Sequence, residues 1–412
     1  MDLSKNQKKI VLISSGQPSL NPRLVKEADA LSNAGYAITV LYAYWNEWGT
    51  VTDKTLLASK KWKAVRIGGD PQKKRLIYFF SRFINKLCVL LAKTFGIAYF
   101  ADFAIARASF FLSHEAPKYR ADLYIGHNLG ALPATVKAAK VNKKPCGFDA
   151  EDFHRNEISD DPNDLDVQLK KKIEDKYIPQ LAYFTSSSPS ISDAYYKLYN
   201  QKAPVTLLNV FPINNQIAAP RKAASSEIKL FWFSQTIGLG RGIDDCIEVL
   251  RILNNPNIEL HLLGFADEDT KKHLHDIAGG NIAIDFHEPV PPDNIALLAS
   301  GFDIGLALED NTPLNRDICL TNKIFTYLQA GLAIVASDTT AQKNLLKMYP
   351  GTGKLYENGN VKMLATTIRY YCDHKDELYQ TKIAAYQIAR TELNWEKESE
   401  KFLKVISDTL AD

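Results

Sequence analysis

Short apolar segments alternate with amphipathic segments along nearly the whole chain, and this alternation constrains the fold more than any other feature. In the first half, segments typical of buried strands cover 9–13, 37–42, 122–125 and 145–148. In the second half, such segments cover 228–233, 258–263, 282–286, 304–308 and 332–336. Helical patterns lie between them, and strands that alternate with helices predict parallel sheets covered by helices on both faces. The predicted fold class is therefore α/β.

The length of the chain predicts two domains. A chain of 412 residues is too long for one compact core. The stretch 209–227 contains two prolines and paired asparagines but no apolar periodicity, which is typical of a linker. We therefore predict an N-terminal domain over 1–210, a linker over 211–227 and a C-terminal domain over 228–387. A last amphipathic helix occupies part of 388–412.

Composition excludes several classes of protein. The net charge of +3 argues against a dedicated nucleic-acid-binding protein, whose domains are usually far more basic. The first residues enter a strand directly, and we therefore expect no signal peptide. The five cysteines lack any C-x-x-C pair, which favours reduced thiols in a cytoplasmic protein over a zinc site or a disulfide framework.

Residues 319–338, CLTNKIFTYLQAGLAIVASD, carry the most informative local pattern. Thr321 is placed to cap a helix that begins at Asn322 or Lys323 and ends at Gly331. A lysine in the first turn adds to the positive end of the helix dipole, and such a helix end attracts an anion, usually phosphate. An isolated exposed lysine is more often merely solvated, so the functional interpretation depends on the rest of the segment.

This segment resembles the donor-binding element of nucleotide-sugar glycosyltransferases, N-K-x-F-E-Y-x-x-x-G-x-P-V-V-A-S. The matching positions are Asn322, Lys323, Phe325, Tyr327, Gly331, Val335, Ala336 and Ser337. The chain departs from the family at three positions. Thr326 replaces the glutamate that binds the donor ribose, Ile318 replaces a second glutamate, and Ala333 replaces a proline. The resemblance implies two Rossmann-like domains facing across a cleft, the GT-B architecture, and is strongest to the retaining family-4 branch. It also implies that the donor binds the C-terminal domain, the acceptor binds the N-terminal domain, and the final helix crosses back to the latter.

The loop 234–242, SQTIGLGRG, lies between a predicted strand and a predicted helix. Its glycines allow backbone amides to converge on a phosphate and Arg241 adds a cation, although a tight turn explains the glycines equally well. Ile243 stands where a dinucleotide fingerprint needs a third glycine, and no Gly-Lys-Ser/Thr follows, which argues against NAD and ATP. The loop is similar to the family's G-R-x-x-x-x-K-G element, with Arg241 and Gly242 in place of Lys-Gly. The expected donor-binding residues are Gly16, Ser234, Gly238, Gly240, Arg241, Gly264, Glu309, Thr321, Asn322, Lys323 and Thr326.

In the first half, residues 16–23 lead into a helix that echoes the family pattern R-x-x-K-E-A-x-x-L-x-x-x-G. A capped helix explains Asn21 and Pro22 fully, which leaves Gly16 and Arg23 for function. The segment 125–128, IGHN, ends a strand where open α/β sheets bind ligands, and it is similar to a histidine-bearing segment of the family.

The segment 148–154, FDAEDFH, closes another strand with three acids and a histidine. It resembles the family's Y-D-x-H-E element. Clustered carboxylates raise each other's pKa and are general-base candidates, whereas a hydrated loop with capping acids is the structural alternative. The expected catalytic residues are His127, Glu151, Asp152, Arg241 and Lys323, and the expected acceptor-side residues are Arg23, Asn128, Asp149 and His154. Other acidic pairs read as helix caps, and no metal is predicted.

Residues 75–96 form a predicted amphipathic helix with apolar side chains at helical spacing and four basic residues in one stripe on the opposite face. The charges are too many for a spanning helix. Two orientations are open. The helix packs its apolar face on the sheet with its basic face in water, which is the ordinary arrangement, or it rests on anionic lipid at the inner face of the cell membrane.

We therefore expect a metal-independent glycosyltransferase of polysaccharide biosynthesis that retains anomeric configuration. A nucleotide-diphosphate sugar is the co-substrate, no other cofactor is required, and the acceptor is a glycan or a lipid-linked glycan. Capture of the leaving diphosphate by Lys323 and Arg241 supplies the main catalytic effect. Two alternatives remain open: a sugar-nucleotide 2-epimerase, which shares the architecture, and a catalytically silent nucleotide-sugar or glycan-binding protein, suggested by Thr326 and Ile318.

Overall fold

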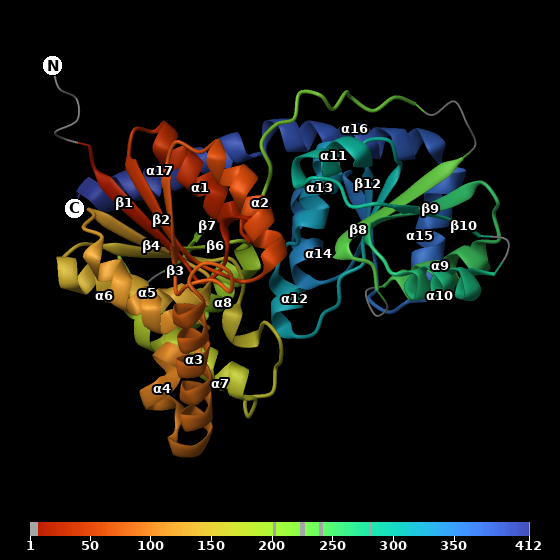
Figure 1. The fold of residues 1–412 in the computed structure, drawn as a ribbon. Helices are drawn as coiled ribbons and strands as arrows, with labels where there is room; N and C mark the ends of the chain where they lie inside the picture. Colours follow the sequence, from red (N-terminus) through yellow and green to blue (C-terminus); the bar gives the residue numbers. More distant parts are fainter. Residues whose placement is uncertain (1–6, 201–202, 223–226, 239–241, 280–281, 412) are drawn as a thin grey trace. The chain divides into compact units, whose positions relative to one another are not determined.

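The computed structural model describes residues 7–200, 203–222, 227–238, 242–279 and 282–411, and these fold into two compact units (Figure 1). Unit 1 takes the described parts of Met1–Leu207 and Ser399–Asp412, and unit 2 is Leu208–Glu398. The boundary therefore precedes the predicted linker, because Val210 is fully buried in a core of unit 2. Helix α17 (Trp395–Ala411) brings the chain back to unit 1, where Phe402 and Ile406 join the core.

Unit 1 is built on a seven-stranded parallel sheet in the order β3-β2-β1-β4-β5-β6-β7. Its strands are β1 (Lys9–Ser14), β2 (Ala37–Ala43), β3 (Lys63–Ile67), β4 (Leu123–His127), β5 (Cys146–Ala150), β6 (Tyr183–Ser186) and β7 (Val205–Thr206). Its other helices are α1 (Pro22–Asn33), α2 (Glu47–Ala58), α3 (Arg75–Phe95), α4 (Ile97–Ala104), α5 (Ser109–Glu115), α6 (Leu132–Asn142), α7 (Leu165–Tyr177) and α8 (Pro189–Leu198). The order reverses between β1 and β4, and this switch point is where open α/β sheets bind ligands.

Unit 2 is built on a six-stranded parallel sheet in the order β10-β9-β8-β11-β12-β13. Its strands are β8 (Ile228–Thr236), β9 (Ile258–Phe265), β10 (Ala283–His287), β11 (Ile304–Ala307), β12 (Ala333–Ser337) and β13 (Gly353–Tyr356). Its helices are α9 (Ile243–Leu253), α10 (Glu268–Ala278), α11 (Pro292–Ala299), α12 (Leu314–Ile318), α13 (Asn322–Ala330), α14 (Thr340–Met348), α15 (Val361–Asp373) and α16 (Lys375–Thr391). Its switch point lies between β8 and β11.

Both faces of the second sheet are buried, as the unbroken apolar runs predict. Leu230 and Trp232 on β8 pack in one core with residues of α9 and α15. Phe231 points to the other face and packs with residues of α13 and α16. Successive residues of a strand point to opposite faces, and helices on both faces therefore require apolar side chains at every position.

The capping residues predicted for α1 and α13 behave differently. Asn21 accepts a hydrogen bond from the backbone N–H of Leu24, and Pro22 is the first residue of α1, as predicted. Helix α13 begins at Asn322 and ends before Gly331, whose φ of 67° suits glycine. The prediction that Thr321 caps α13 with its side chain is wrong, because its hydroxyl donates to Glu309 instead.

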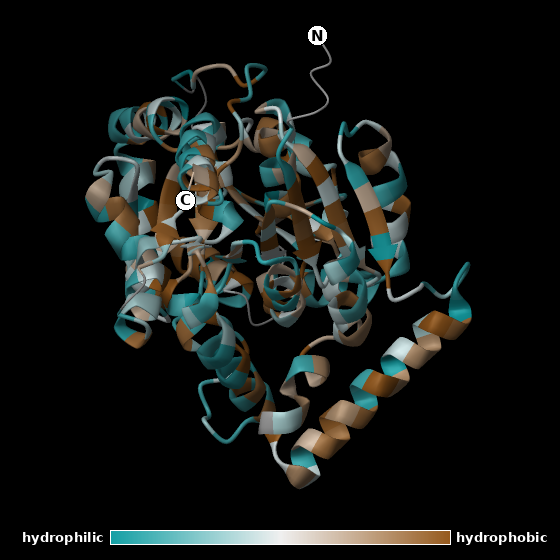
Figure 2. Ribbon diagram, turned by 90° about the vertical axis from the view of Figure 1, so that its left-hand side faces the viewer, coloured by the Kyte–Doolittle hydropathy of each residue, from teal (hydrophilic) through white to brown (hydrophobic). Residues whose placement is uncertain are grey.

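Helix α3 does not pack its apolar face on the sheet, which was the ordinary arrangement expected for it. Its inward face carries Ser81, Cys88 and Ala92 and packs against α4 and α5. Its outward face is apolar, and the exposed residues on it include Leu76 at 87%, Phe79 at 57%, Phe83 at 60% and Leu90 at 57% exposure. Figure 2 shows α3 as the long helix that extends away from the rest of unit 1, with brown and teal residues along it.

The basic residues of α3 flank its apolar face and do not lie opposite it. Arg75, Lys86 and Lys93 are exposed on the same outward side. At about 100° per residue, these residues fall along one edge of the apolar stripe. Within the described ranges, no helix combines the length and the hydropathy that a membrane crossing requires.

Candidate functional site

The carboxyl ends of β1 and β4 bring polar groups together at the switch point of unit 1. The Ser14 hydroxyl donates to the Asn128 side-chain oxygen over 2.9 Å and accepts from the Gly16 backbone N–H over 3.1 Å. Asn128 has a φ of 65°, a left-handed conformation that asparagine tolerates better than most residues. The Ser14 hydroxyl therefore links the predicted residues Gly16 and Asn128, which lie in two adjacent loops, and His127 is the last residue of β4.

A buried cluster of charged side chains surrounds His127. Its Nε2 lies 3.2 Å from a carboxylate oxygen of Glu27 on α1. Its Nδ1 lies 3.7 Å from Asp149 on β5 and 3.7 Å from Glu151 just beyond β5. The Arg23 guanidinium grips both oxygens of Asp149, one through Nη2 at 2.8 Å, and donates to the Leu207 carbonyl at 2.6 Å. Three carboxylates thus face two cationic side chains.

The electrostatics of this cluster make His127 a cation. Burial lowers the pKa of the imidazole, but the Glu27 carboxylate and the neighbouring acids outweigh it and raise the pKa to about 10. Burial raises the pKa of Asp149, yet the Arg23 guanidinium overcomes this effect and holds it below its ordinary value. A histidine protonated at neutral pH cannot accept a proton, so His127 is suited to stabilising negative charge and positioning groups and is a poor general base.

The same cluster brings together three side chains with metal-binding chemistry. One ligand atom each from Glu27, His127 and Asp149 lies within 4.8 Å of the others. Both oxygens of Asp149 already accept from Arg23, and a protonated imidazole has no lone pair for a metal. These groups fit an ion-pair network better than a metal centre.

Three other residues predicted for the first half take different positions. Arg23, expected to contact the acceptor, is 1% exposed and holds Asp149, so no face of it is left for a ligand. His154 is buried beside Glu157, with Nδ1 3.3 Å from that carboxylate, and does not join the cluster around His127. The Asp152 carbonyl accepts from the Tyr195 hydroxyl, which fixes the turn beyond β5.

Sequence reasoning missed the role of Glu27. It stands one turn after Arg23 on α1, with 3.6 Å between its Oε1 and the Arg23 Nε, and is 1% exposed. The only sequence signal was its place beside Lys26 in the family pattern. Burial and the nearby Arg23 charge lower the pKa of the neighbouring Lys26 to about 7.

At the switch point of unit 2, two glycines allow the strand ends to approach closely. Gly242 precedes α9 with a φ of 77°, and a Cβ there would stand 2.5 Å from the Leu308 Cβ. A Cβ on Gly264 would stand 2.3 Å from the Ser234 carbonyl oxygen. A Cβ on Gly238 would meet no atom within 4 Å. The predicted donor residues Gly240 and Arg241 lie outside the described residues.

The amino end of α13 holds a compact polar group. Lys323 Nζ lies 2.6 Å from Glu309 Oε1, and the Thr321 hydroxyl donates to the same oxygen over 3.1 Å. The lysine also lies over the Trp232 ring, 5.6 Å from its centroid. Lys323 and Glu309 are 18% and 17% exposed, so both can reach a ligand. Lys323 was expected to make this helix end positively charged, and the structure shows that Glu309 balances its charge.

The two helix amino ends of this region differ in charge. Helix α9 has Asp244 and Asp245 in its first turn, where carboxylates already balance the helix dipole. Helix α13 has no acid in its first turn. We infer that α13 is the better anion site of the two.

Thr326 does not replace the family glutamate at the donor ribose. It is 3% exposed, and its hydroxyl donates to the Asn322 carbonyl one turn earlier over 2.9 Å. The Asn322 side-chain oxygen accepts from Asn209. The expectation that Thr326 contacts a donor is therefore corrected: its side chain completes a hydrogen bond inside α13.

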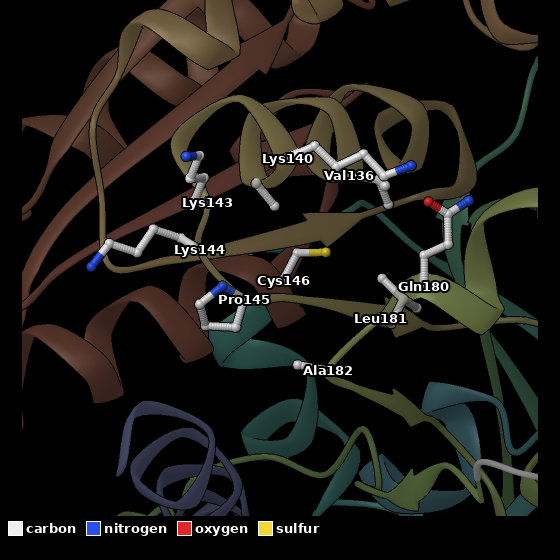
Figure 3. Close-up of a pocket in the computed structure, with 10 residues that line it drawn as sticks. Val136, Lys140, Lys143, Lys144, Pro145, Cys146, Gln180, Leu181 and Ala182 are labelled. Atoms are coloured by element: carbon white, nitrogen blue, oxygen red, sulfur yellow. The ribbon is translucent and has the colours of Figure 1, made fainter. Parts of the chain in front are cut away.

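A cavity of about 400 Å³ lies at the opposite edge of the first sheet (Figure 3). Lys140, Lys143, Lys144, Gln180 and Cys146 are among its lining residues, and it sits beside the amino ends of β5 and β6. Open α/β sheets bind ligands at the carboxyl ends of their strands, and we do not assign this cavity to the active site.

Two parallel-sheet α/β units with helices on both faces define the GT-B fold, as expected from the sequence. Neither a family model nor a curated protein sequence matches the chain. Among solved structures, it is similar to Anabaena Alr3699/HepE in complex with UDP, with a TM-score of 0.67 and 15% identity over 98% of this chain and 100% of that one. A glycosyltransferase from Rickettsia africae ESF-5 gives a TM-score of 0.67 and 12% identity over 98% and 99% of the two chains. A putative UDP-N-acetylglucosamine 2-epimerase from Listeria monocytogenes gives 0.54 and 13% over 93% and 95%.

Proposed function

We propose that this protein is a glycosyltransferase that moves a sugar from a nucleotide-diphosphate donor to a glycan or lipid-linked glycan, as a step of polysaccharide biosynthesis. The observation that carries the proposal is the group formed by Lys323, Glu309 and the acid-free amino end of α13. It lies at the carboxyl edge of a sheet whose relatives in fold include a protein crystallised with UDP. A helix amino end with a lysine suits a diphosphate, and a carboxylate beside it suits sugar hydroxyls.

Titration calorimetry with UDP tests the donor site. Lys323→Ala should weaken UDP binding at least fivefold, about 1 kcal/mol, because it removes a charge-assisted contact. Lys347→Ala, on the exposed surface of α14 in the same unit, is the matched control and should leave affinity unchanged. Equal UDP affinity in the Lys323 variant and the control would refute the assignment.

The acceptor half of the proposal rests on unit 1. Among the acids around His127, the Glu151 carboxylate is 21% exposed at a strand end, where it can orient a sugar and support positive charge on its ring, and the buried His127 imidazolium holds that carboxylate in place. In a retaining, metal-independent reaction, a donor phosphate oxygen takes the acceptor proton. Glu151→Gln and Asp152→Asn should then each lower turnover well under the ~10²–10⁴-fold expected for losing a general base. An inverted product anomer by proton NMR, or a nearly inactive amide variant, would refute retention.

Two other functions stay open, each with its own observation. A 2-epimerase is favoured by the similarity to the Listeria monocytogenes protein. A silent binding protein is favoured by the burial of Thr326 and Ile318 where the family has glutamates. Incubation with a panel of nucleotide sugars separates them: free nucleoside diphosphate indicates transfer, isomerised donor indicates epimerisation, and binding alone indicates a silent protein.

We also place the protein in the cytoplasm, in peripheral contact with the anionic inner face of the cell membrane through residues 75–96. The outward apolar face of α3 supports this proposal, because an exposed apolar stripe with basic residues along one edge matches an interfacial helix. Flotation with vesicles at low salt tests it. Equal binding to anionic and neutral vesicles would contradict the electrostatic part of the contact.

A further inference from the structure

A second cationic site lies in unit 1 beside α3. A cavity of about 420 Å³ is lined by the segment after β2, by α3 and by Arg107 from the connection between α4 and α5. Its polar and aromatic lining comprises Tyr44, Trp45, Asn46, Glu47, Tyr78, Arg82, Asn85, Lys86 and Arg107.

Hydrogen bonds fix the backbone that carries Arg107 against α3. The Ser81 hydroxyl donates to the Arg107 carbonyl over 2.6 Å. The Asn85 amide donates to the carbonyls of Phe103 at 2.9 Å and Ala104 at 3.0 Å. Ser81 and Asn85 therefore join α3 to α4 and to the segment that follows it. The position of Arg107 near Arg82 is therefore built into the fold.

The guanidinium groups of this cavity stack on aromatic rings. Arg82 lies 3.6 Å from the centroid of Tyr78, and Arg107 lies 4.7 Å from that of Trp45. Stacking holds a guanidinium in place while its N–H edge stays available to an acceptor. Within the described residues, no carboxylate pairs with Arg82, Lys86 or Arg107.

The charges in the cavity are unbalanced. Three cationic side chains line it against the carboxylate of Glu47, which accepts from the Gln72 amide over 2.8 Å. Burial lowers the pKa of Arg82, and the charge of Arg107 lowers it further against the opposing effect of Tyr78. Like charges held together without a partner favour an anion between them.

The cavity borders the outward apolar face of α3. At about 100° per residue, Lys86 falls between Arg82 on the cavity side and Leu90 and Phe83 on the apolar side. A lipid whose chains lie against the apolar face would therefore place its head group at Lys86 and Arg82. Planar guanidinium forks bind phosphate oxygens in pairs, and a terminal phosphate offers more of them than a phosphodiester.

We propose that Arg82, Lys86 and Arg107 form a binding site for the terminal phosphate group of a membrane lipid, which holds unit 1 at the membrane surface. The cavity follows β2 at the carboxyl edge of the sheet, the edge that also holds His127. The inference rests on the membrane contact of the proposed function. It adds the chemical group that the site recognises.

Vesicle flotation tests the site with two lipids of the same chain composition. Phosphatidylcholine vesicles carry either phosphatidic acid, which has a terminal phosphate, or phosphatidylglycerol, which has a phosphodiester, in amounts adjusted to equal zeta potential. We expect the wild type to bind phosphatidic acid vesicles several-fold more tightly. Arg82→Lys with Arg107→Lys keeps both charges but removes the forks, and should abolish this preference while binding to phosphatidylglycerol persists.

Further variants separate the cavity from general surface charge. Arg82→Ala with Arg107→Ala should weaken binding to both anionic vesicles, by about fivefold for each lost cation. Lys137→Ala with Lys140→Ala removes two exposed lysines from α6 and should leave binding unchanged. Phe83→Ser with Leu90→Ser changes only exposed side chains and should abolish binding to every vesicle.

Each contrary result overturns the proposal. Equal binding to the two anionic vesicles, or a preference that survives in the double lysine variant, would show that the cavity responds to charge and that its guanidinium groups do not distinguish a terminal phosphate. Quenching of Trp45 fluorescence by inorganic pyrophosphate, with no vesicle preference, would indicate a site for a free anion. Equal UDP affinity in the Lys323→Ala variant and its control would refute the donor assignment but leave the vesicle result standing, so the two failures are distinguishable.

Discussion

Replacement of His127 by glutamine should reveal a pH-dependent contribution of the unit 1 cluster to stability. The variant removes a cation that Glu27, Asp149 and Glu151 approach within 3.2–3.7 Å. The pKa of His127 is raised from 6.5 to about 10. A tenfold change in proton affinity corresponds to about 1.4 kcal/mol, so the charged imidazole contributes on the order of a few kcal/mol to stability.

The sign of the pH dependence follows from the direction of the shift. The folded protein binds the His127 proton more tightly than the unfolded chain does, so the stabilisation is fully present below pH 6.5. It is lost as the pH rises from 6.5 toward 10, where the folded imidazole also deprotonates. The free energy of unfolding of the wild type should therefore exceed that of the variant by a few kcal/mol at pH 6, and by much less at pH 9.5.

Urea unfolding, followed by circular dichroism at several pH values, measures this difference. Titrating groups far from His127 cancel between the two proteins, whereas the pKa of Glu27 and of Asp149 is higher in the variant, because the His127 cation lowers both in the wild type. His273→Gln on α10 changes an exposed histidine and should alter the unfolding free energy by less than about 0.5 kcal/mol at any pH. A wild-type advantage over the His127 variant that stays constant from pH 6 to 9.5 would refute the reasoning, because neutral packing alone would then explain the loss.

Three substitutions in unit 2 give further tests. Glu309→Gln should tighten UDP binding several-fold by calorimetry, because it frees Lys323 from a 2.6 Å ion pair; weaker binding would instead make Glu309 itself a ligand contact. Thr326→Glu should leave UDP affinity no tighter and lower the melting temperature, since it places a carboxylate at a site that is 3% exposed; tighter binding would show that this position still faces a ribose. Gly242→Ala should destabilise the protein by about 1–3 kcal/mol in thermal unfolding, because its Cβ would lie 2.5 Å from the Leu308 Cβ at a positive φ; unchanged stability would mean that the loop relaxes freely.

The sequence predicted the elements whose ends are marked by local chemistry. Asn21 and Pro22 start α1 where expected, and Gly331 ends α13, because a cap, a proline at the first position and a left-handed glycine act within a few residues. Four strands escaped prediction: β3, β6, β7 and β13. β3 carries mostly half-exposed side chains, β7 has two residues, and short edge strands lack the apolar runs of central strands.

The candidate site was harder to predict because its chemistry depends on distant pairings. Arg23 and Asp149 are 126 residues apart, and nothing local shows that the guanidinium is used to hold the carboxylate. In the sequence, Glu27 is only one position of a helix pattern. Its charge is important because β4 places His127 beside it in the fold. The apolar face of α3 points outward because α4 covers the face that carries its small residues. The periodicity of a helix does not show which of its faces a neighbouring helix covers.

The cationic side chains of the candidate sites differ in whether a carboxylate pairs with them. Lys323 and Arg23 are already neutralised by carboxylates, so an incoming anion gains affinity at Lys323 only by exchanging with Glu309. Such an exchange favours a ligand that offers Glu309 new donors at the same time, as sugar hydroxyls would beside a diphosphate. Among the residues that the structure describes, no carboxylate pairs with Arg82 or Arg107, so the site proposed there would require only a phosphate. The pattern of pairing thus separates a site that requires a composite ligand from one that recognises a single charged group.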